Sequence, residues 1–131
     1  MMTKARARTL IDSGTATEKL AAYSRAVVDG EWVLVSGTLG VDTVTGALPE
    51  GARAQAEQAF VTIEAALSRA GASLADVVRT RIYLTNRDDV AEVAAVLREK
   101  FADIRPANTT ILCQLPHPRA CGEIEMTARV R

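Results

Sequence analysis

Hydrophobic residues recur at three- and four-residue spacing in two segments of this sequence, and each segment predicts an amphipathic helix. In residues 52–70 the apolar stripe consists of Ala56, Ala59, Phe60, Ile63, Leu67 and Ala70. Gly71 follows it, at a position where helices often end. In residues 89–101 the stripe consists of Val90, Val93, Ala94, Leu97 and Phe101. Pro106 lies beyond that helix, where the chain cannot remain helical.

Strict alternation of apolar and polar residues predicts strands elsewhere. Residues 122–130 alternate most clearly, with Gly122, Ile124, Met126, Ala128 and Val130 on one side. Residues 77–84 and 108–115 alternate less cleanly. Asp29-Gly30 separates two apolar runs and predicts a hairpin before the first helix. The predicted order is β-β-α-β-α-β-β, with residues 5–11 as a further candidate strand, whose basic alternation would protect a sheet edge.

Two helices with one apolar stripe each can cover only one face of such a sheet, so the sequence predicts an α+β fold of two layers. The strand 77–84 would turn Val78, Thr80, Ile82 and Leu84 toward the helices. In strand 108–115, Cys113 falls on the apolar side and is expected in the core. The opposite face would carry polar side chains, namely Glu123, Glu125, Thr127, Asn108, Thr110, Gln114 and arginines of the middle strand. That face either contacts water or forms a hydrated subunit interface that holds a site.

Composition limits the class of function. The chain has 131 residues, enough for one domain spanning residues 1–131, and its formal net charge is zero, which argues against a nucleic-acid-binding protein. The basic start leads into no apolar segment and no run reaches the length of a membrane span, so we expect a cytoplasmic protein. One histidine, His117, and two cysteines are too few for a zinc site or a disulfide scaffold, so no metal is expected. Cys121 is a candidate reactive thiol.

An ordered set of motifs resembles the RidA/YjgF family from about Tyr23 to Val130. These motifs are Tyr23, Ser36-Gly37, Asp76-Val77-Val78-Arg79-Thr80, Arg105-Pro106-Ala107 and Glu123-Ile124-Glu125. The resemblance implies a chorismate-mutase-like fold with a mixed sheet. It also implies a homotrimer that binds small molecules in clefts between subunits and needs no cofactor.

The same resemblance implies a chemistry: hydrolysis of reactive enamines and imines, such as 2-aminoacrylate, to 2-keto acids and ammonia. In the family a glutamate positions the attacking water, and Glu123 matches it. Tyr23, Ser36 and Gly37 match residues that line the cleft, although Ala21-Ala22 replaces the usual Gly-Pro before the tyrosine. Asn108 replaces the arginine that binds the substrate carboxylate, and Thr110 replaces a common cysteine.

With Asn108 in place of the arginine, this chain lacks the guanidinium that would bind a carboxylate through two charge-assisted hydrogen bonds. Hydrogen bonds to charged groups contribute roughly 1.5–3 kcal/mol each, so the loss is on the order of 3 kcal/mol, about a hundredfold in rate or affinity. We therefore expect weak or absent 2-aminoacrylate deaminase activity, unless another arginine takes over the role. The candidates for that role are Arg25, Arg79, Arg81 and Arg119.

Three functions remain open at this point. The first is an imine- or enamine-hydrolysing enzyme in which Asn108 and Thr110 bind an uncharged group and Glu123 acts on water. The second is a non-catalytic trimer that binds a ligand or regulates a partner enzyme. The third, ribonuclease activity, is disfavoured by the neutral charge and by the absence of a basic-aromatic patch.

Overall fold

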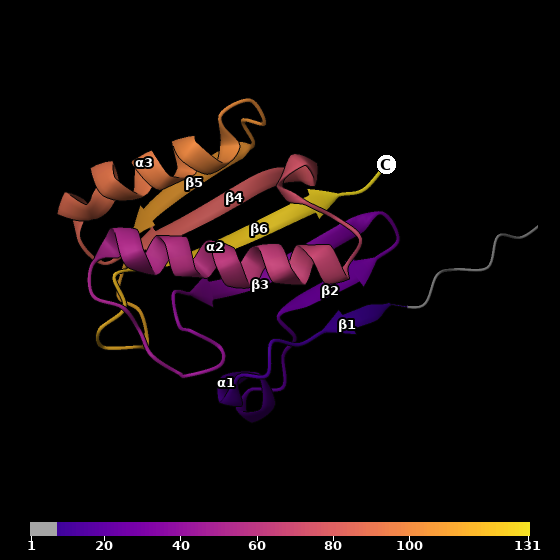
Figure 1. Ribbon diagram of the computed structural model, residues 1–131, viewed down its shortest axis with the longest axis horizontal. Helices are drawn as coiled ribbons and strands as arrows, with labels where there is room; N and C mark the ends of the chain where they lie inside the picture. Colours follow the sequence, from indigo (N-terminus) through magenta and orange to yellow (C-terminus); the bar gives the residue numbers. More distant parts are fainter. Residues whose placement is uncertain (1–7) are drawn as a thin grey trace, which may run out of the picture.

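The computed structural model describes residues 8–131, which form one six-stranded sheet covered by helices on one face (Figure 1). The strands are β1 (Thr9–Ile11), β2 (Ala26–Asp29), β3 (Trp32–Leu39), β4 (Val77–Leu84), β5 (Ala107–Leu112) and β6 (Gly122–Arg129). The helices are α1 (Ala16–Leu20), α2 (Ala52–Arg69) and α3 (Val90–Phe101), with short 3-10 turns η1 (Leu74–Asp76) and η2 (Arg87–Asp89). None of the helices in this part of the chain is long and apolar enough to cross a membrane.

The strand order β1-β2-β3-β6-β4-β5 explains why both long helices share a face. Strands β3 and β4 both pair antiparallel with β6 and so run in the same direction, and β4 pairs parallel with β5. The connections β3-α2-β4 and β4-α3-β5 therefore cross the sheet in the same direction. Because such connections are nearly always right-handed, α2 and α3 both pack on one side (Figure 1). The predicted α+β architecture and the mixed sheet are confirmed.

The elements at the start of the chain were only partly predicted. The hairpin at Asp29-Gly30 is present, with Gly30 at a φ of 60°. The candidate strand 5–11 corresponds to β1, which begins at Thr9. Residues 5–7 lie outside the described part, and so do Lys4 and Arg6 of the basic alternation. Helix α1 was missed because five residues are too few to show a helical period.

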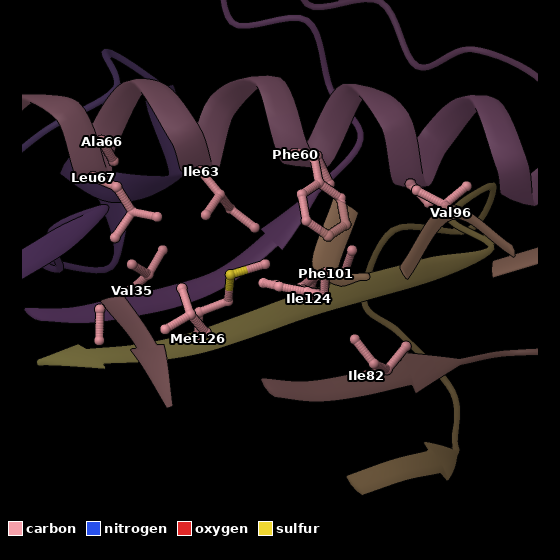
Figure 2. Close-up of a cluster of buried hydrophobic side chains, with 14 of the residues drawn as sticks. Val35, Phe60, Ile63, Ala66, Leu67, Ile82, Val96, Phe101, Ile124 and Met126 are labelled. Atoms are coloured by element: carbon pink, nitrogen blue, oxygen red, sulfur yellow. The ribbon is translucent and has the colours of Figure 1, made fainter. Parts of the chain in front are cut away.

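The core lies between α2 and the centre of the sheet, as Figure 2 shows. Phe60, Ile63 and Leu67 of the predicted stripe are completely buried. Phe60 meets Phe101 of α3 edge to face, with 5.6 Å between the ring centroids. In α3 the prediction needs correction at two positions, since Val90 and Ala94 are exposed, and Val96, which was not in the predicted stripe, is buried.

Strand β4 departs from strict alternation at its start. Val77 pairs with Ala128 and Arg79 with Thr127, so Val78 is an extra residue in a β-bulge. Val77 is consequently buried and Val78 exposed, the reverse of the prediction for this pair. The alternation of β6 is confirmed, because Ile124, Met126 and Ala128 are all buried.

Strand β5 faces the other way from the prediction. Asn108 pairs with Thr80 and Thr110 with Ile82, and both partners are buried beneath the helices. Asn108 and Thr110 therefore lie on the helix side of the sheet, whereas Glu123 lies on the open side. The prediction was wrong because β5 is an edge strand whose residues are all exposed, so its hydrophobic pattern does not report burial. Cys113, expected in the core, is half-buried.

Candidate functional site

A β-bulge in β3 makes room for Glu123. Val35 pairs with Met126 and Thr38 with Ile124, so Ser36 and Gly37 together lie opposite a single residue of β6. A Cβ atom on Gly37 would overlap the Glu123 carboxylate. The glycine is therefore required here for space, and its missing side chain leaves the position that the carboxylate occupies.

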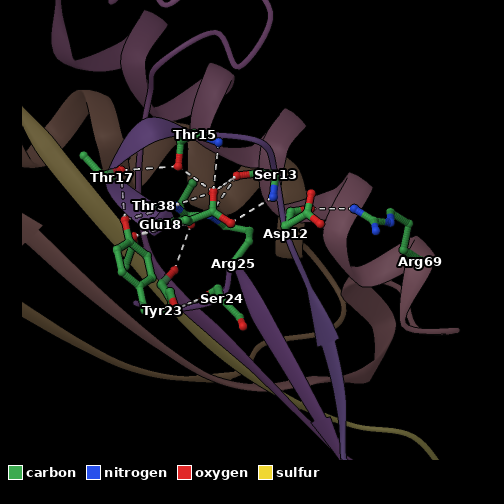
Figure 3. Close-up of polar contacts among 12 residues, drawn as sticks. Asp12, Ser13, Thr15, Thr17, Glu18, Tyr23, Ser24, Arg25, Thr38 and Arg69 are labelled. Carbon is green, nitrogen blue, oxygen red and sulfur yellow. Dashed lines mark hydrogen bonds and ion pairs between the residues drawn. The ribbon is translucent and has the colours of Figure 1, made fainter. Parts of the chain in front are cut away.

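Arg25 lies beside this bulge, buried to 4% exposure, and all of its guanidinium nitrogens have partners (Figure 3). Nε donates to Ser13 Oγ at 3.3 Å, and Nη1 donates to the Gly37 carbonyl at 2.8 Å and to Thr38 Oγ1 at 3.1 Å. Nη2 donates to the Tyr23 hydroxyl at 3.4 Å and lies 3.6 Å from a Glu18 oxygen. Arg25 thus holds the bulge in place, and each of its three guanidinium nitrogens already has a partner in the protein.

Glu18 is the counter-charge of Arg25 and is equally buried, at 5% exposure. Its carboxylate accepts hydrogen bonds from the backbone and side chains of Ser13 and Thr15, which closes the first turn of α1 (Figure 3). Burial raises the pKa of Glu18, but these hydrogen bonds and the charge of Arg25 outweigh it and lower the pKa to about 2. Glu18 is therefore ionised at all physiological pH values.

Glu123, Tyr23 and Gly37 line one cavity of about 700 Å³. Its wall is completed by the segments 13–17, 38–39 and 41–46 and by Arg25, Thr62, Pro116 and His117. Thr62 is 7% exposed, and its hydroxyl forms no hydrogen bond with the described residues. Such a volume accommodates a small metabolite.

The Glu123 carboxylate forms no hydrogen bond with residues 8–131, unlike that of Glu18. Burial raises the pKa of Glu123; Arg25 opposes this shift, and the nearby charge of Glu125 adds to it. A carboxylate with a raised pKa and free lone pairs is suited to accept a proton from water. The predicted catalytic residue therefore lies in an environment that permits its predicted role.

Tyr23 and Ser36, both predicted to line the cleft, have different positions. The Tyr23 hydroxyl lies at the cavity and donates to Thr17 Oγ1 at 3.1 Å. The Ser36 hydroxyl instead donates to the Ser24 carbonyl at 2.6 Å, which joins β3 to the segment before β2. Before Tyr23, Ala22 has a φ of 55°, which proline cannot adopt, so the chain reaches Tyr23 by a path that excludes a Gly-Pro pair.

Asn108 lines a second, separate cavity of about 340 Å³. Its side-chain carbonyl accepts from Thr80 Oγ1 at 2.8 Å and its amide donates to Thr110 Oγ1 at 3.1 Å. Two arginines line this cavity with it, Arg98 at the end of α3 and Arg105, whose φ of 53° is unusual for a residue with a side chain. Within one chain, Asn108 and Thr110 are therefore not brought together with Glu123.

The four arginines considered as substitutes for the missing one do not fill that role in the single chain. Arg25 is saturated, and Arg81 lies 3.8 Å from Glu125 on the open face. Neither Arg79 nor the Arg119 side chain lines the two cavities. Arg98 of α3, beside Asn108, was missed because a surface arginine on a helix gives no sequence signal until the fold places it; Arg105 was noted only as part of the Arg105-Pro106-Ala107 motif and not for this role. Residues 8–131 also hold no group of three His, Cys, Asp or Glu side chains arranged for a metal ion.

Comparison with known proteins gives consistent matches. The model of the family described as Endoribonuclease L-PSP matches residues 13–130. A 2-iminobutanoate/2-iminopropanoate deaminase of Dermatophagoides farinae is 32% identical over 82% of this chain and 85% of its own length. A RutC family protein of Pyrococcus abyssi is also 32% identical, over 80% of this chain and 84% of its own. The crystal structure of a YjgF/YER057c/UK114 family member from Mycobacterium tuberculosis is 41% identical, with a TM-score of 0.87, and covers 95% of this chain and 100% of its own.

Proposed function

Because this chain belongs to the RidA/YjgF family, also described as Endoribonuclease L-PSP, we propose that it hydrolyses small imines or enamines to carbonyl compounds and ammonia. The observation that carries the proposal is the Glu123 carboxylate. It is half-buried, free of hydrogen bonds to the described residues, and lies in the wall of a cavity of about 700 Å³.

The reaction needs a base, a positioned water and a polar wall. Glu123 accepts a proton from water as the oxygen bonds to the imine carbon, the C=N electron pair moves to nitrogen, and the protonated Glu123 returns that proton to the nitrogen. The resulting carbinolamine then loses ammonia and leaves a carbonyl group. Tyr23 provides a hydrogen-bonding group for the substrate on the same wall.

We further propose that activity on 2-aminoacrylate and its tautomer 2-iminopropanoate is weak or absent. The substrate carboxylate would meet Asn108, whose side-chain carbonyl and amide already bond to threonines. Arg25, whose charge acts on Glu123, already has partners at all three guanidinium nitrogens. Uncharged imines avoid this deficit, and they also avoid repulsion from Glu123 itself.

The chain's other proposed property is assembly as a homotrimer with sites between subunits. The polar open face of the sheet and the two half-sites that one chain keeps apart, Glu123 and Asn108, both support this. In the trimer, Asn108 of one subunit would approach Glu123 of another.

The alternative function is a non-catalytic trimer that binds a ligand or regulates a partner enzyme. The contacts of Arg25 and Asn108 favour it. These are the two cavity residues considered for binding a carboxylate, and both already bond to other groups of the chain. The zero net charge argues against a nucleic-acid substrate.

The test measures pyruvate release from 2-aminoacrylate generated in place by a serine dehydratase, together with hydrolysis of an uncharged N-alkyl aldimine, which releases an alkylamine in place of ammonia, followed by ultraviolet absorbance. We expect turnover of the aldimine and little acceleration of pyruvate release. Glu123→Gln should lower aldimine turnover at least a hundredfold. Ligand binding without turnover of either compound would favour the non-catalytic alternative, and rapid pyruvate release would show that another cation replaces the missing arginine.

Asn108→Arg is the matched gain-of-function variant. If the rest of the site is intact, restoring the guanidinium should raise pyruvate release by about a hundredfold, the equivalent of about 3 kcal/mol. The double variant Asn108→Arg, Glu123→Gln should lose this gain. An unchanged rate in Asn108→Arg, with the protein folded, would contradict the proposed position of the carboxylate.

A further inference from the structure

The cavity of about 340 Å³ lies at one edge of the sheet, where α3 and β5 run beside each other (Figure 1). Its wall consists of residues from β4, from the end of α3 and the turn after it, and from the start of β5. It shares no lining residue with the cavity that Glu123 lines. Its volume accommodates a small organic molecule.

Positive charge is concentrated in this cavity. Among the described residues, Arg98 and Arg105 are the only charged ones that line it, and both are exposed. Neither guanidinium forms a hydrogen bond or an ion pair with residues 8–131. The acidic neighbour of Arg98 in α3, Glu99, lies 2.8 Å from Arg53 through both of its oxygens, and Asp103 does not line the cavity. The wall therefore carries two positive charges and no negative one.

Arginines near the end of a helix can have a simpler role, because they hydrogen-bond to the free carbonyl groups there. In α3 the main chain takes this role. The Phe101 carbonyl accepts from the backbone N–H groups of Ile104 and Arg105, at 2.9 and 3.1 Å. Neither guanidinium bonds to a carbonyl of the described residues, so both remain available to a ligand.

The backbone of Arg105 gives a second reason to look for a role of its side chain. Its φ of 53° lies in the left-handed region. After a helix that conformation usually belongs to Gly or Asn, because a Cβ atom makes it less favourable. The local turn thus disfavours an arginine, and strain of this kind is typical of positions where the side chain has a function.

The rest of the wall is mainly apolar and includes Leu97, Phe101 and Pro106. Its polar side chains, Thr80 and Asn108, bond to each other at 2.8 Å. One guanidinium can donate two parallel hydrogen bonds to a carboxylate, and apolar surface favours contact with a hydrocarbon group. The combination suits an anion that has an apolar body.

We propose that this cavity is a binding site for a small organic carboxylate, whose oxygens bind Arg98 and Arg105 and whose apolar part contacts Leu97 and Phe101. The site differs from the position considered for the carboxylate of 2-iminopropanoate, which requires a donor at Asn108 itself. Its wall holds no carboxylate, imidazole or thiol, so the ligand is bound there without being converted. The proposal is independent of the proposed hydrolysis at Glu123.

The first experiment measures binding of benzoate to the native protein by calorimetry. Benzyl alcohol has the same ring without the charge, and acetate has the charge without the ring. We expect both to bind roughly tenfold or more weakly than benzoate. Equal binding of benzyl alcohol would overturn the role of the arginines, and equal binding of acetate would overturn the apolar contact. Absence of benzoate binding up to about 10 mM would overturn the site as a whole.

The second experiment locates the bound benzoate. Arg98→Gln and Arg105→Gly should each weaken its binding roughly tenfold or more. Arg105→Gly should keep the native melting temperature, because glycine adopts a φ of 53° readily, so a loss of binding there is not a loss of structure. Arg87→Gln is the matched control, since Arg87 is an exposed arginine of η2 that does not line the cavity. Native affinity in Arg98→Gln and Arg105→Gly, or an equal loss in Arg87→Gln, would overturn the proposal.

Discussion

Two carboxylates lie near the buried guanidinium of Arg25, and their pKa values move in opposite directions. Glu18 accepts hydrogen bonds from Ser13 and Thr15 and is held ionised. Glu123 has no such donors among the described residues, and burial dominates its pKa. The environment thus gives Glu18 a structural role and leaves Glu123 available for proton transfer. Active sites often contain two carboxylates that differ in this way.

Replacing Glu123 should show how much its ionised carboxylate lowers the free energy of unfolding at each pH. The pKa of Glu123 is raised on folding, so the folded protein binds its proton more tightly and loses stability as pH rises above the ordinary value of 4.5. Glu123→Gln should therefore be more stable than the native chain at pH 7 and about equally stable below pH 4. Urea unfolding at several pH values measures this, and a variant that is less stable at pH 7 would contradict the prediction.

Glu18 should show the opposite dependence. A pKa lowered from 4.5 to about 2 corresponds to about 3 kcal/mol of stability, present above pH 4.5 and lost as pH falls toward 2. Glu18→Gln should lower the free energy of unfolding at pH 7 by about that amount and remove this part of the acid transition. Native-like stability of the variant at pH 7 would show that the hydrogen bonds from Ser13 and Thr15 and the pair with Arg25 contribute little.

At the scale of elements, two glycines in and after β3 lie close to other parts of the chain, and they differ in what surrounds them. A Cβ on Gly37 would meet the end of the Glu123 side chain, which can move aside. A Cβ on Gly40 would meet the backbone of Gln55 in α2, which cannot. Replacement of glycine by alanine should therefore affect mainly turnover at position 37 and mainly stability at position 40.

Gly37→Ala should reduce turnover strongly, because the carboxylate is displaced from its position, while thermal stability changes little. Gly40→Ala should lower the free energy of unfolding by roughly 1–3 kcal/mol or more, because the helix must shift on the sheet. Thermal unfolding and aldimine turnover of the two variants measure both effects. An active Gly37→Ala enzyme would show that the Glu123 position in the bulge is not the productive one.

How far the sequence predicts these elements depends on whether one face of an element is buried. Helix α2 and strand β6 each have a buried and an exposed side, so their periodicity predicted them well. Strand β5 is an edge, and there Thr109 and Ile111 gave a misleading pattern. The bulge at Val78 adds a residue without any distinguishing side chain. Tyr23, Gly37 and Glu123 could be named from the resemblance, but the saturation of Arg25 depends on contacts between distant segments that no local pattern contains.

At the scale of the whole molecule, the open face of the sheet is the largest feature without a covering layer in the described part of the chain. It is mainly polar, with the ion pair between Arg81 and Glu125 and the hydrogen bond from Tyr83 to Glu125. Exposed apolar side chains lie among these groups, including Leu34 and Ile111. This mixture is typical of a hydrated interface between subunits.

Size-exclusion chromatography with light scattering should therefore give a mass three times the 14.0 kDa of the chain. Leu34→Asp, on the open face, should shift the protein to monomers and abolish turnover, since each site would lack the partner's residues. Val61→Asp is the matched control, because Val61 is an equally exposed apolar residue on α2, in the other layer. A monomeric native protein, or a trimer that survives Leu34→Asp, would contradict this assembly.

The two bulges have a joint consequence for how the chain tolerates insertions and deletions. Both neighbours of β6 carry one extra residue, at Ser36-Gly37 and at Val78, whereas β6 itself carries none. Each extra residue shifts the sequence periodicity beyond it, but not the side of the sheet to which the following residues turn. Deleting one residue at Ser36-Gly37 would therefore leave Thr38 opposite Ile124 and facing the core, but would remove the space that the Glu123 carboxylate occupies. A deletion of one residue at this bulge would thus spare the core and affect the site.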